Sequence, residues 1–290
     1  MAEEEKRKLQ ELGGSLYLSL PSSWINKFHL KKGSEVIIST KESGEINIFP
    51  EAQGKEEEKI SVINYNNYFF RNLMRDYLFG SDIIKVKNTK PFSKSEREKI
   101  FSYVNNLLNL EIIEEESNAI TIQNLKSDIP VTKMISRMYF LTKSMIEDLI
   151  KEPTNKEVLR GIIERDKLVG KFYLAIIMQQ RALLTQRWSK ELSFVEILDL
   201  RLLIERIELI GDELKNLALE LLNKKAKINF VDLQFLLERY DEAYNAYIKK
   251  DTKVAEKFWD NETPDKKRVS YNEILNRIYD HIKDITDLVI

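Results

Sequence analysis

The sequence contains no cysteine, and this absence excludes disulfide bonds, thiolate metal sites and thiol catalysis. It also has only two histidines, nine glycines and six prolines among 290 residues. So few glycines and prolines favour a helix-rich fold, because these residues interrupt helices. His29 lies in an apolar run and His281 follows Asp280, and we interpret both histidines as structural.

Long apolar stretches are missing as well. A membrane-spanning helix needs roughly 18 or more uncharged, mostly apolar residues. The most apolar stretch, Leu174–Met178, lies between Lys171 and Arg181. The first eight residues are acidic and then basic, so we expect no secretory signal peptide. These features predict a cytoplasmic protein without membrane insertion.

Neither sign of charge dominates, since 46 Lys and Arg face 47 Asp and Glu. The motifs of common enzymes are missing too. We find no nucleophile elbow, no glycine-rich loop ending in Lys-Ser or Lys-Thr, and no Gly-x-Gly-x-x-Gly. We therefore predict that the protein is not an enzyme.

The chain divides into three regions, which together predict an α+β multidomain fold. Residues 1–52 hold short β-type runs separated by turns, and 36–40 with 45–49 predict a hairpin. A short helix is expected within 21–30, capped by Ser22 or Ser23. The charged run 54–59 then predicts a linker.

Residues 60–128 predict a small α+β module, in which the sequence shows no motif that indicates a function. The expected strands are 60–65, 82–87, 110–115 and 119–123, and the first expected helix is 66–79, closed by Gly80. A second helix starts at Ser93 or Ser95, each with a Glu at capping-box spacing.

Residues 130–290 show the 3.6-residue period of amphipathic helices, which predicts an all-α bundle. We expect helices at about 131–151, 155–187, 193–223, 230–250, 252–261 and 266–289. Asp212–Ala218 resembles Asp280–Thr286 in its order of acidic, apolar and Lys residues. This similarity predicts two repeats of three helices each.

The N-terminal region resembles the AbrB/SpoVT domain over about 45 residues. The similar parts are the Gly-Gly-Ser turn at 13–15, the Leu-Ser-Leu-Pro strand end at 18–21 and the Leu-Lys-Lys-Gly-Ser-Glu turn at 30–35. The resemblance implies a swapped-hairpin β domain that forms an intertwined homodimer and binds DNA. A β unit this small also buries little core alone, which independently favours a second copy.

Basic residues outnumber acidic ones by six to one between Lys6 and Lys32. Such a stripe is the electrostatic signature of phosphate contacts. The candidate DNA-binding residues are Lys6, Arg7, Lys8, Gly13, Gly14, Ser15, Lys31 and Lys32. The alternative is a solvated face on a dimerisation module, since residues 1–50 hold seven basic and seven acidic residues, and Ser22-Ser23 replaces the Lys that relatives often carry after Leu-Pro.

The C-terminal region resembles PhoU proteins. The similarity is carried by Glu208-Leu-Ile-Gly-Asp-Glu-Leu-Lys-Asn-Leu-Ala218, by its weaker echo at 277–287 and by the acidic segment 163–170. Together the two resemblances imply an archaeal AbrB–PhoU fusion and a PhoU-like bundle of two three-helix repeats. In that family such carboxylates hold divalent or iron-type metal ions, which implies the candidate ligands Asp166, Glu208, Asp212, Asp280 and Asp284.

Spacing alone leaves the partner of these carboxylates open. Residues four apart share a helix face, so Glu208 and Asp212 repel each other and require either a basic neighbour or a hard cation. The sequence also departs from the PhoU pattern, with Gly170 in place of a second Asp and Glu213 in place of His.

Two functions follow from the resemblances. The first is a dimeric DNA-binding transcriptional regulator of phosphate uptake with a PhoU-like sensor domain. The alternative is a PhoU-like signalling adaptor that docks on a phosphate transporter or sensor protein and uses its β domain only to dimerise.

Overall fold

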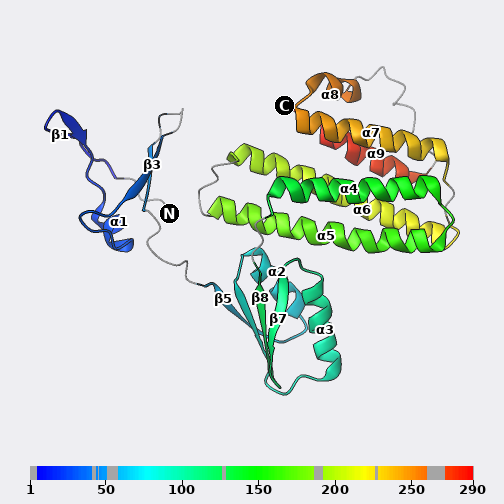
Figure 1. Ribbon diagram of the computed structural model, residues 1–290, viewed down its shortest axis with the longest axis horizontal. Coiled ribbons are helices and arrows are strands. Elements are labelled where there is room, and N and C mark those ends of the chain that lie inside the picture. Colours follow the sequence, from blue (N-terminus) through cyan, green and yellow to red (C-terminus); the bar gives the residue numbers. More distant parts are fainter. Residues whose placement is uncertain are drawn as a thin grey trace. The chain divides into compact units, whose positions relative to one another are not determined.

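The computed structural model describes residues 5–40, 44, 46–50, 58–125, 129–185, 192–225, 228–259 and 272–289 (Figure 1). They belong to two compact units, Met1–Glu57 and Glu58–Ile290. The predicted turn at 41–44, most of the linker, the break at 188–192 and the expected start of the last helix at 266–271 lie wholly or partly outside the described residues.

The first unit contains two hairpins and a short helix. Strands β1 (Gln10–Leu12) and β2 (Ser15–Tyr17) pair antiparallel, as do β3 (Val36–Thr40) and β4 (Ile46–Pro50). Gly13 and Gly14 connect β1 to β2 with φ angles of 61° and 80°. Positive φ at both positions is what a two-residue type I′ turn requires, which explains the two glycines.

The helix of the first unit, α1 (Ser22–Lys27), corrects one prediction. Its N-cap residue is Pro21, which makes no side-chain capping bond. A serine cap at Ser22 or Ser23 is therefore wrong, because both serines lie inside the helix. Proline suits this boundary, since its fixed φ is compatible with helix initiation and it lacks an N–H to satisfy.

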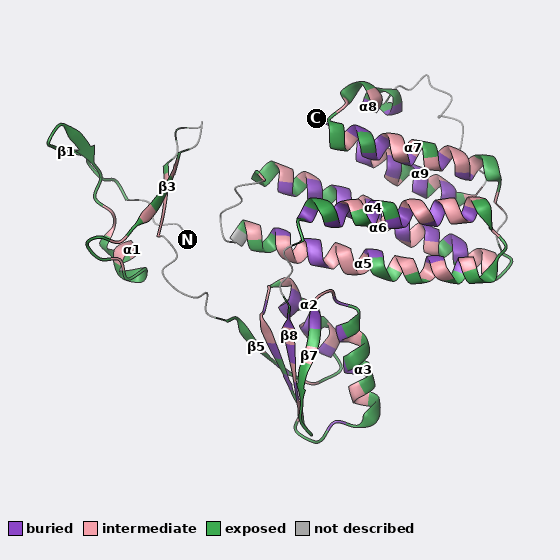
Figure 2. Ribbon diagram, viewed as in Figure 1, coloured by how far each residue is buried: buried purple, intermediate pink, exposed green. Residues whose placement is uncertain are grey.

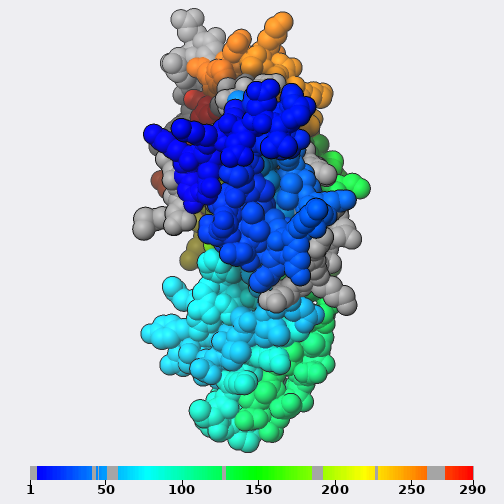
Figure 3. Space-filling view, turned by 90° about the vertical axis from the view of Figure 1, so that its left-hand side faces the viewer, coloured from blue at the N-terminus to red at the C-terminus, as the bar shows by residue number. Residues whose placement is uncertain are grey.

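The first unit has no core of its own among its described residues, none of which is buried. Its apolar side chains are open to solvent, and Leu16 is 68% exposed. Figure 3 shows the described atoms of this unit in blue. Isolated two-stranded hairpins are at best marginally stable in water, so this unit requires a partner surface.

The second unit begins with the α+β module. It consists of β5 (Ile60–Asn64), α2 (Phe69–Leu78), β6 (Ile83–Lys87), α3 (Lys94–Asn105), β7 (Leu110–Glu115) and β8 (Ala119–Asn124). The strands form one sheet in the order β5-β6-β8-β7, in which only β5 and β6 are parallel. The sheet has the strands that the sequence predicts, with ends that agree within one or two residues.

One face of this sheet is covered by α2 and α3. Leu73 and Tyr77 of α2 and Ile100 of α3 share a buried cluster with the alternate residues Ile84 and Val86 of β6. The helix boundaries follow local chemistry. Ser93 and Glu96 form the capping box of α3, which decides between the two predicted caps, and Gly80 follows α2 with a φ of 70°.

The helical bundle comprises α4 (Val131–Lys151), α5 (Lys156–Thr185), α6 (Phe194–Leu222), α7 (Phe230–Lys249), α8 (Thr252–Trp259) and α9 (Glu273–Thr286). The six predicted helices are thus confirmed where the structure describes them. Their buried faces form one continuous core, visible as the purple stripes in Figure 2. Among the described helices, none combines the length and the apolar character that crossing a bilayer demands.

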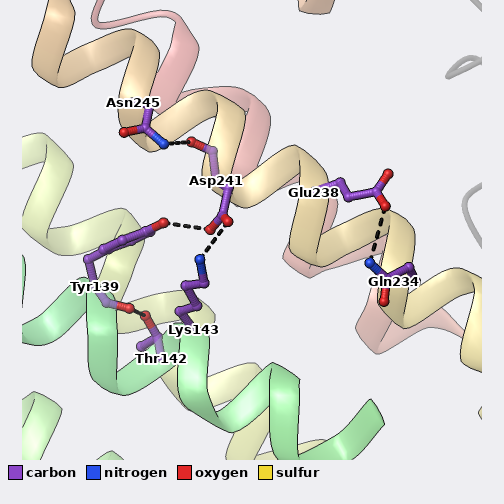
Figure 4. A network of polar contacts seen from close by, with 7 residues as sticks. All are labelled: Tyr139, Thr142, Lys143, Gln234, Glu238, Asp241 and Asn245. Carbon is purple, nitrogen blue, oxygen red and sulfur yellow. Dashed lines mark hydrogen bonds and ion pairs between the residues drawn. The ribbon is translucent and has the colours of Figure 1, made fainter.

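A network of polar and aromatic contacts joins α4 to α7 (Figure 4). Asp241 of α7 accepts a hydrogen bond from the Tyr139 hydroxyl at 2.5 Å. It also forms an ion pair with Nζ of Lys143 at 2.5 Å. The Tyr244 ring stacks on Tyr139 with 3.7 Å between ring centroids. The buried Tyr240 hydroxyl lies 2.8 Å from Oγ1 of Thr142. This network fixes α7 against α4.

Candidate functional site

Three of the predicted ligands come together on neighbouring helices. Asp166 lies on α5, and Glu208 and Asp212 lie on α6; we call these three residues the acidic cluster. Lys215 of α6 bridges the two helices. Its Nζ donates to Oδ2 of Asp166 at 2.9 Å and also to Asp212. The structure therefore contains the basic neighbour that the repulsion between Glu208 and Asp212 requires.

A glycine lies where α6 packs closely against α4 and α5. Gly211 is buried in α6, and a Cβ atom there would lie 3.5 Å from Oδ1 of Asp166 and 3.5 Å from Cγ2 of Thr142. Any side chain longer than alanine would push α4 and α5 away. A small residue at position 211 is therefore compatible with the close packing that holds Asp166 within reach of Lys215.

The acidic cluster is only partly shielded from water, since the Asp212 side chain is 40% exposed. The Asp166 side chain is 14% exposed and that of Lys215 28%. Burial raises the pKa of Asp166, which the Lys215 ammonium lowers only in part. Burial would by itself lower the pKa of Lys215, but hydrogen bonds to Asp212 and Asp166 outweigh it and raise the pKa. Lys215 is thus charged at neutral pH.

Glu208 is the member of the cluster that no cation contacts directly. Within the described residues its carboxylate makes no hydrogen bond or ion pair. Burial, followed by the negative charges of Asp212 and Asp166, raises its pKa from 4.5 to about 7. A proton on Glu208 therefore compensates part of the negative charge that Lys215 does not neutralise.

The second predicted set lies on α9 and is not gathered in the same way. Asp284 pairs with Arg206 of α6 at 3.2 Å, and Asp280 is exposed. Nearby, Glu213 of α6 accepts two hydrogen bonds from Arg277, at 2.7 and 2.9 Å. Arginines of the partner helix therefore neutralise Asp284 and Glu213 at the α6–α9 contact.

His281 lies beside these arginine pairs. Burial, followed by the positive charge of Arg206, lowers its pKa. A neutral, half-buried imidazole fits the structural role that the sequence suggested. Its Nδ1 atom is buried and has no hydrogen-bond partner among the described residues.

Neither set fits a metal ion. Across the described ranges, no three His, Asp or Glu side chains are grouped so that they would hold one. Hard cations require several converging oxygen ligands, whereas two oxygens of the acidic cluster are already bound to an ammonium group. Around Gly170, where PhoU proteins usually carry an Asp, a Cβ would meet nothing within 4 Å.

The candidate DNA-binding residues all lie in the first unit and are exposed. Lys6, Arg7 and Lys8 precede β1, while Lys31 and Lys32 follow α1. Arg7 is paired with Glu5, which compensates part of the charge in the stripe. Gly13, Gly14 and Ser15 form the end of the first hairpin.

Sequence reasoning missed the cations that complete both sets, namely Lys215, Arg206 and Arg277. The first could have been found, because Lys215 is three residues after Asp212 and therefore shares its helix face. The two arginine pairs cross between α6 and α9 and have no signal in local spacing.

These features define the class of protein: a helical bundle with a small α+β module and an N-terminal β unit that has no buried core among its described residues. Residues 135–221, from α4 to α6, match the family model of the PhoU domain. PhoU from Pseudomonas aeruginosa is similar in structure, with a TM-score of 0.45 and 17% sequence identity, over 55% of this chain and 93% of that chain. A search of the curated proteins gives no match. The predicted PhoU domain in the C-terminal half is thereby confirmed, and the AbrB/SpoVT resemblance stays a prediction.

Proposed function

We propose that this protein is a PhoU-like signalling adaptor. Its helical bundle docks on a phosphate transporter or on a sensor protein, and its N-terminal β unit joins two copies of the chain. The observation that carries the proposal is the PhoU-domain match over α4–α6. The domain belongs to a regulatory family, which agrees with the lack of enzyme motifs in the sequence.

An apolar face on α6 supports docking. Val195, Leu198 and Leu202 lie at spacings of three and four residues, on one side of the helix, and all three are exposed. Leu198 is 60% exposed. Helix faces of this kind provide anchors for protein partners, since an aligned apolar stripe is costly to leave in water.

The adaptor is tested by binding of the full chain to the phosphate-transport proteins and phosphate sensors of the same organism, measured by biolayer interferometry. We expect specific binding that Leu198→Asp weakens at least tenfold, because an aspartate would have to be desolvated at the interface. Thr252→Asp, at the exposed start of α8, is the matched control and should bind like the wild type. Failure of every transport and sensor protein to bind contradicts the adaptor.

Homodimerisation is expected to depend on the apolar residues of the first unit. The double variant Leu16→Asp/Ile38→Asp should be a monomer, because it places charges on the exposed apolar side chains of both hairpins. Light scattering after size exclusion should give 34.2 kDa for the variant and twice that mass for the wild type. Gln10→Asp/Thr40→Asp adds the same charge at exposed polar positions of the same hairpins, and a dimer is expected there.

A DNA-binding regulator is the second candidate. It is favoured by the exposure of the five basic residues among the candidate DNA-binding residues, Lys6, Arg7, Lys8, Lys31 and Lys32. The variant Arg7→Ala/Lys8→Ala/Lys31→Ala/Lys32→Ala separates the two functions. An adaptor keeps its dimer and its protein partner in this variant. A regulator loses salt-sensitive binding to duplex DNA from upstream of phosphate-transport genes.

A further inference from the structure

We infer that the Lys215 ammonium is the cation that the acidic cluster holds, in the position that a metal ion would otherwise occupy. The inference goes beyond the adaptor function and does not depend on which partner the bundle binds. It concerns how this chain maintains the α5–α6 contact of its PhoU domain.

The geometry around Nζ is that of a bound cation. The ammonium bridges two helices, since it donates to Asp166 of α5 and to Asp212 of α6. An ammonium has three N–H donors, and two of them are used by carboxylates, of which Asp166 is the more buried. A divalent ion placed between these carboxylates would have to displace Lys215 and leave its charge buried, which is costly.

The second set shows the same arrangement with a different cation. Arg206 pairs with Asp284, and Arg277 holds both oxygens of Glu213. Of the five residues that the sequence implied as metal ligands, three contact a side-chain cation of this chain, namely Asp166, Asp212 and Asp284. The Arg206–Asp284 pair joins α6 and α9, so it is a separate example of a predicted ligand that contacts a side-chain cation.

Two measurements on the full chain test the inference. The first is the metal content and the thermal unfolding of the wild type, with Mn²⁺ as the probe. We expect far less than one equivalent of metal after purification in metal-replete medium. We also expect the same Tm in EDTA and in Mn²⁺.

The second measurement uses Lys215→Met, which keeps an unbranched side chain that is one atom shorter and removes the charge. This variant leaves three carboxylates without a cation, so we expect a Tm lowered by several degrees in EDTA. Mn²⁺ should restore part of the loss with saturation. Adding Asp166→Asn to Lys215→Met should abolish that rescue.

Lys167→Met is the matched control, because Lys167 is an exposed residue of α5 that pairs only with Glu164 among the described residues. It should unfold like the wild type, with no response to Mn²⁺. Stoichiometric metal in the wild type that Asp212→Asn removes would overturn the inference, even if Lys215→Met fails to fold. A folded Lys215→Met with unchanged Tm, or without Mn²⁺ rescue, would overturn it too.

Discussion

Replacing Tyr240 by alanine is expected to lower the free energy of unfolding by about 3–5 kcal/mol, the usual cost of removing a large aromatic side chain from a core. Tyr240 is fully buried in α7, where its ring meets that of Tyr139 edge-on at 5.1 Å and its hydroxyl contacts Thr142. The substitution leaves a cavity where α7 packs against α4. The PhoU-domain match ends before α7, so the experiment also asks whether the helices after the match share one cooperative core with it.

Urea unfolding followed by circular dichroism at 222 nm measures this effect. Tyr240→Phe is the matched control, because it keeps the ring and removes only the hydroxyl. It should cost about 1 kcal/mol, since Thr142 Oγ1 keeps its bonds to the carbonyls of Met138 and Tyr139. Equal losses in the two variants would mean that the ring contributes little. Two separate unfolding transitions in the wild type would mean that α4–α6 and α7–α9 do not unfold together.

The helices and strands could be predicted from the sequence because their signals are local. The 3.6-residue period gives α4 with its observed ends, Val131 and Lys151, and β3 is given with its ends, Val36 and Thr40. The prediction of a helix start was wrong where neighbouring serines both looked like N-caps and the helix in fact starts without a side-chain cap. Ser22 and Ser23 looked like caps, but Pro21 ends the preceding segment and α1 begins without a side-chain cap.

The candidate site was predicted only in part for a physical reason. Helix spacing places Glu208 and Asp212 on one face, and that much is confirmed by α6. What neutralises them depends on which helix packs opposite and how closely it packs. The small residue Gly211 lies at this contact beside Asp166, but no spacing rule on α6 alone says which helix packs against it.

The pH dependence of stability is expected to report on Glu208. Its pKa is raised from 4.5 to about 7 in the folded protein. The folded protein therefore binds a proton at Glu208 more tightly than the unfolded chain does. A raised carboxyl pKa means that Glu208 destabilises the fold when it is ionised. Stability should therefore fall as the pH rises from about 4.5 to about 7, and the contribution of Glu208 should be constant above that range.

Glu208→Gln removes this titration and keeps the shape of the side chain. At pH 8 we expect the variant to be more stable than the wild type by about 1–2 kcal/mol, because partial solvent exposure weakens the full effect of the pKa shift. At pH 5 the two proteins should be nearly equal, since the wild-type carboxyl is then mostly protonated. Urea unfolding at both values measures the difference, with Glu220→Gln on the same helix as the control.

The groups that act on Glu208 determine how the result is interpreted. Asp212, Asp166 and Glu205 raise its pKa and Lys215 lowers it, whereas burial has the largest effect. If burial and the neighbouring acids dominate, the gain in the variant appears only above pH 6 or so, where Glu208 ionises. A gain that is equal at pH 5 and pH 8 would contradict the raised pKa. A loss of stability at pH 8 would show that the ionised carboxylate is held by a cation, and in this cluster that cation would have to be Lys215.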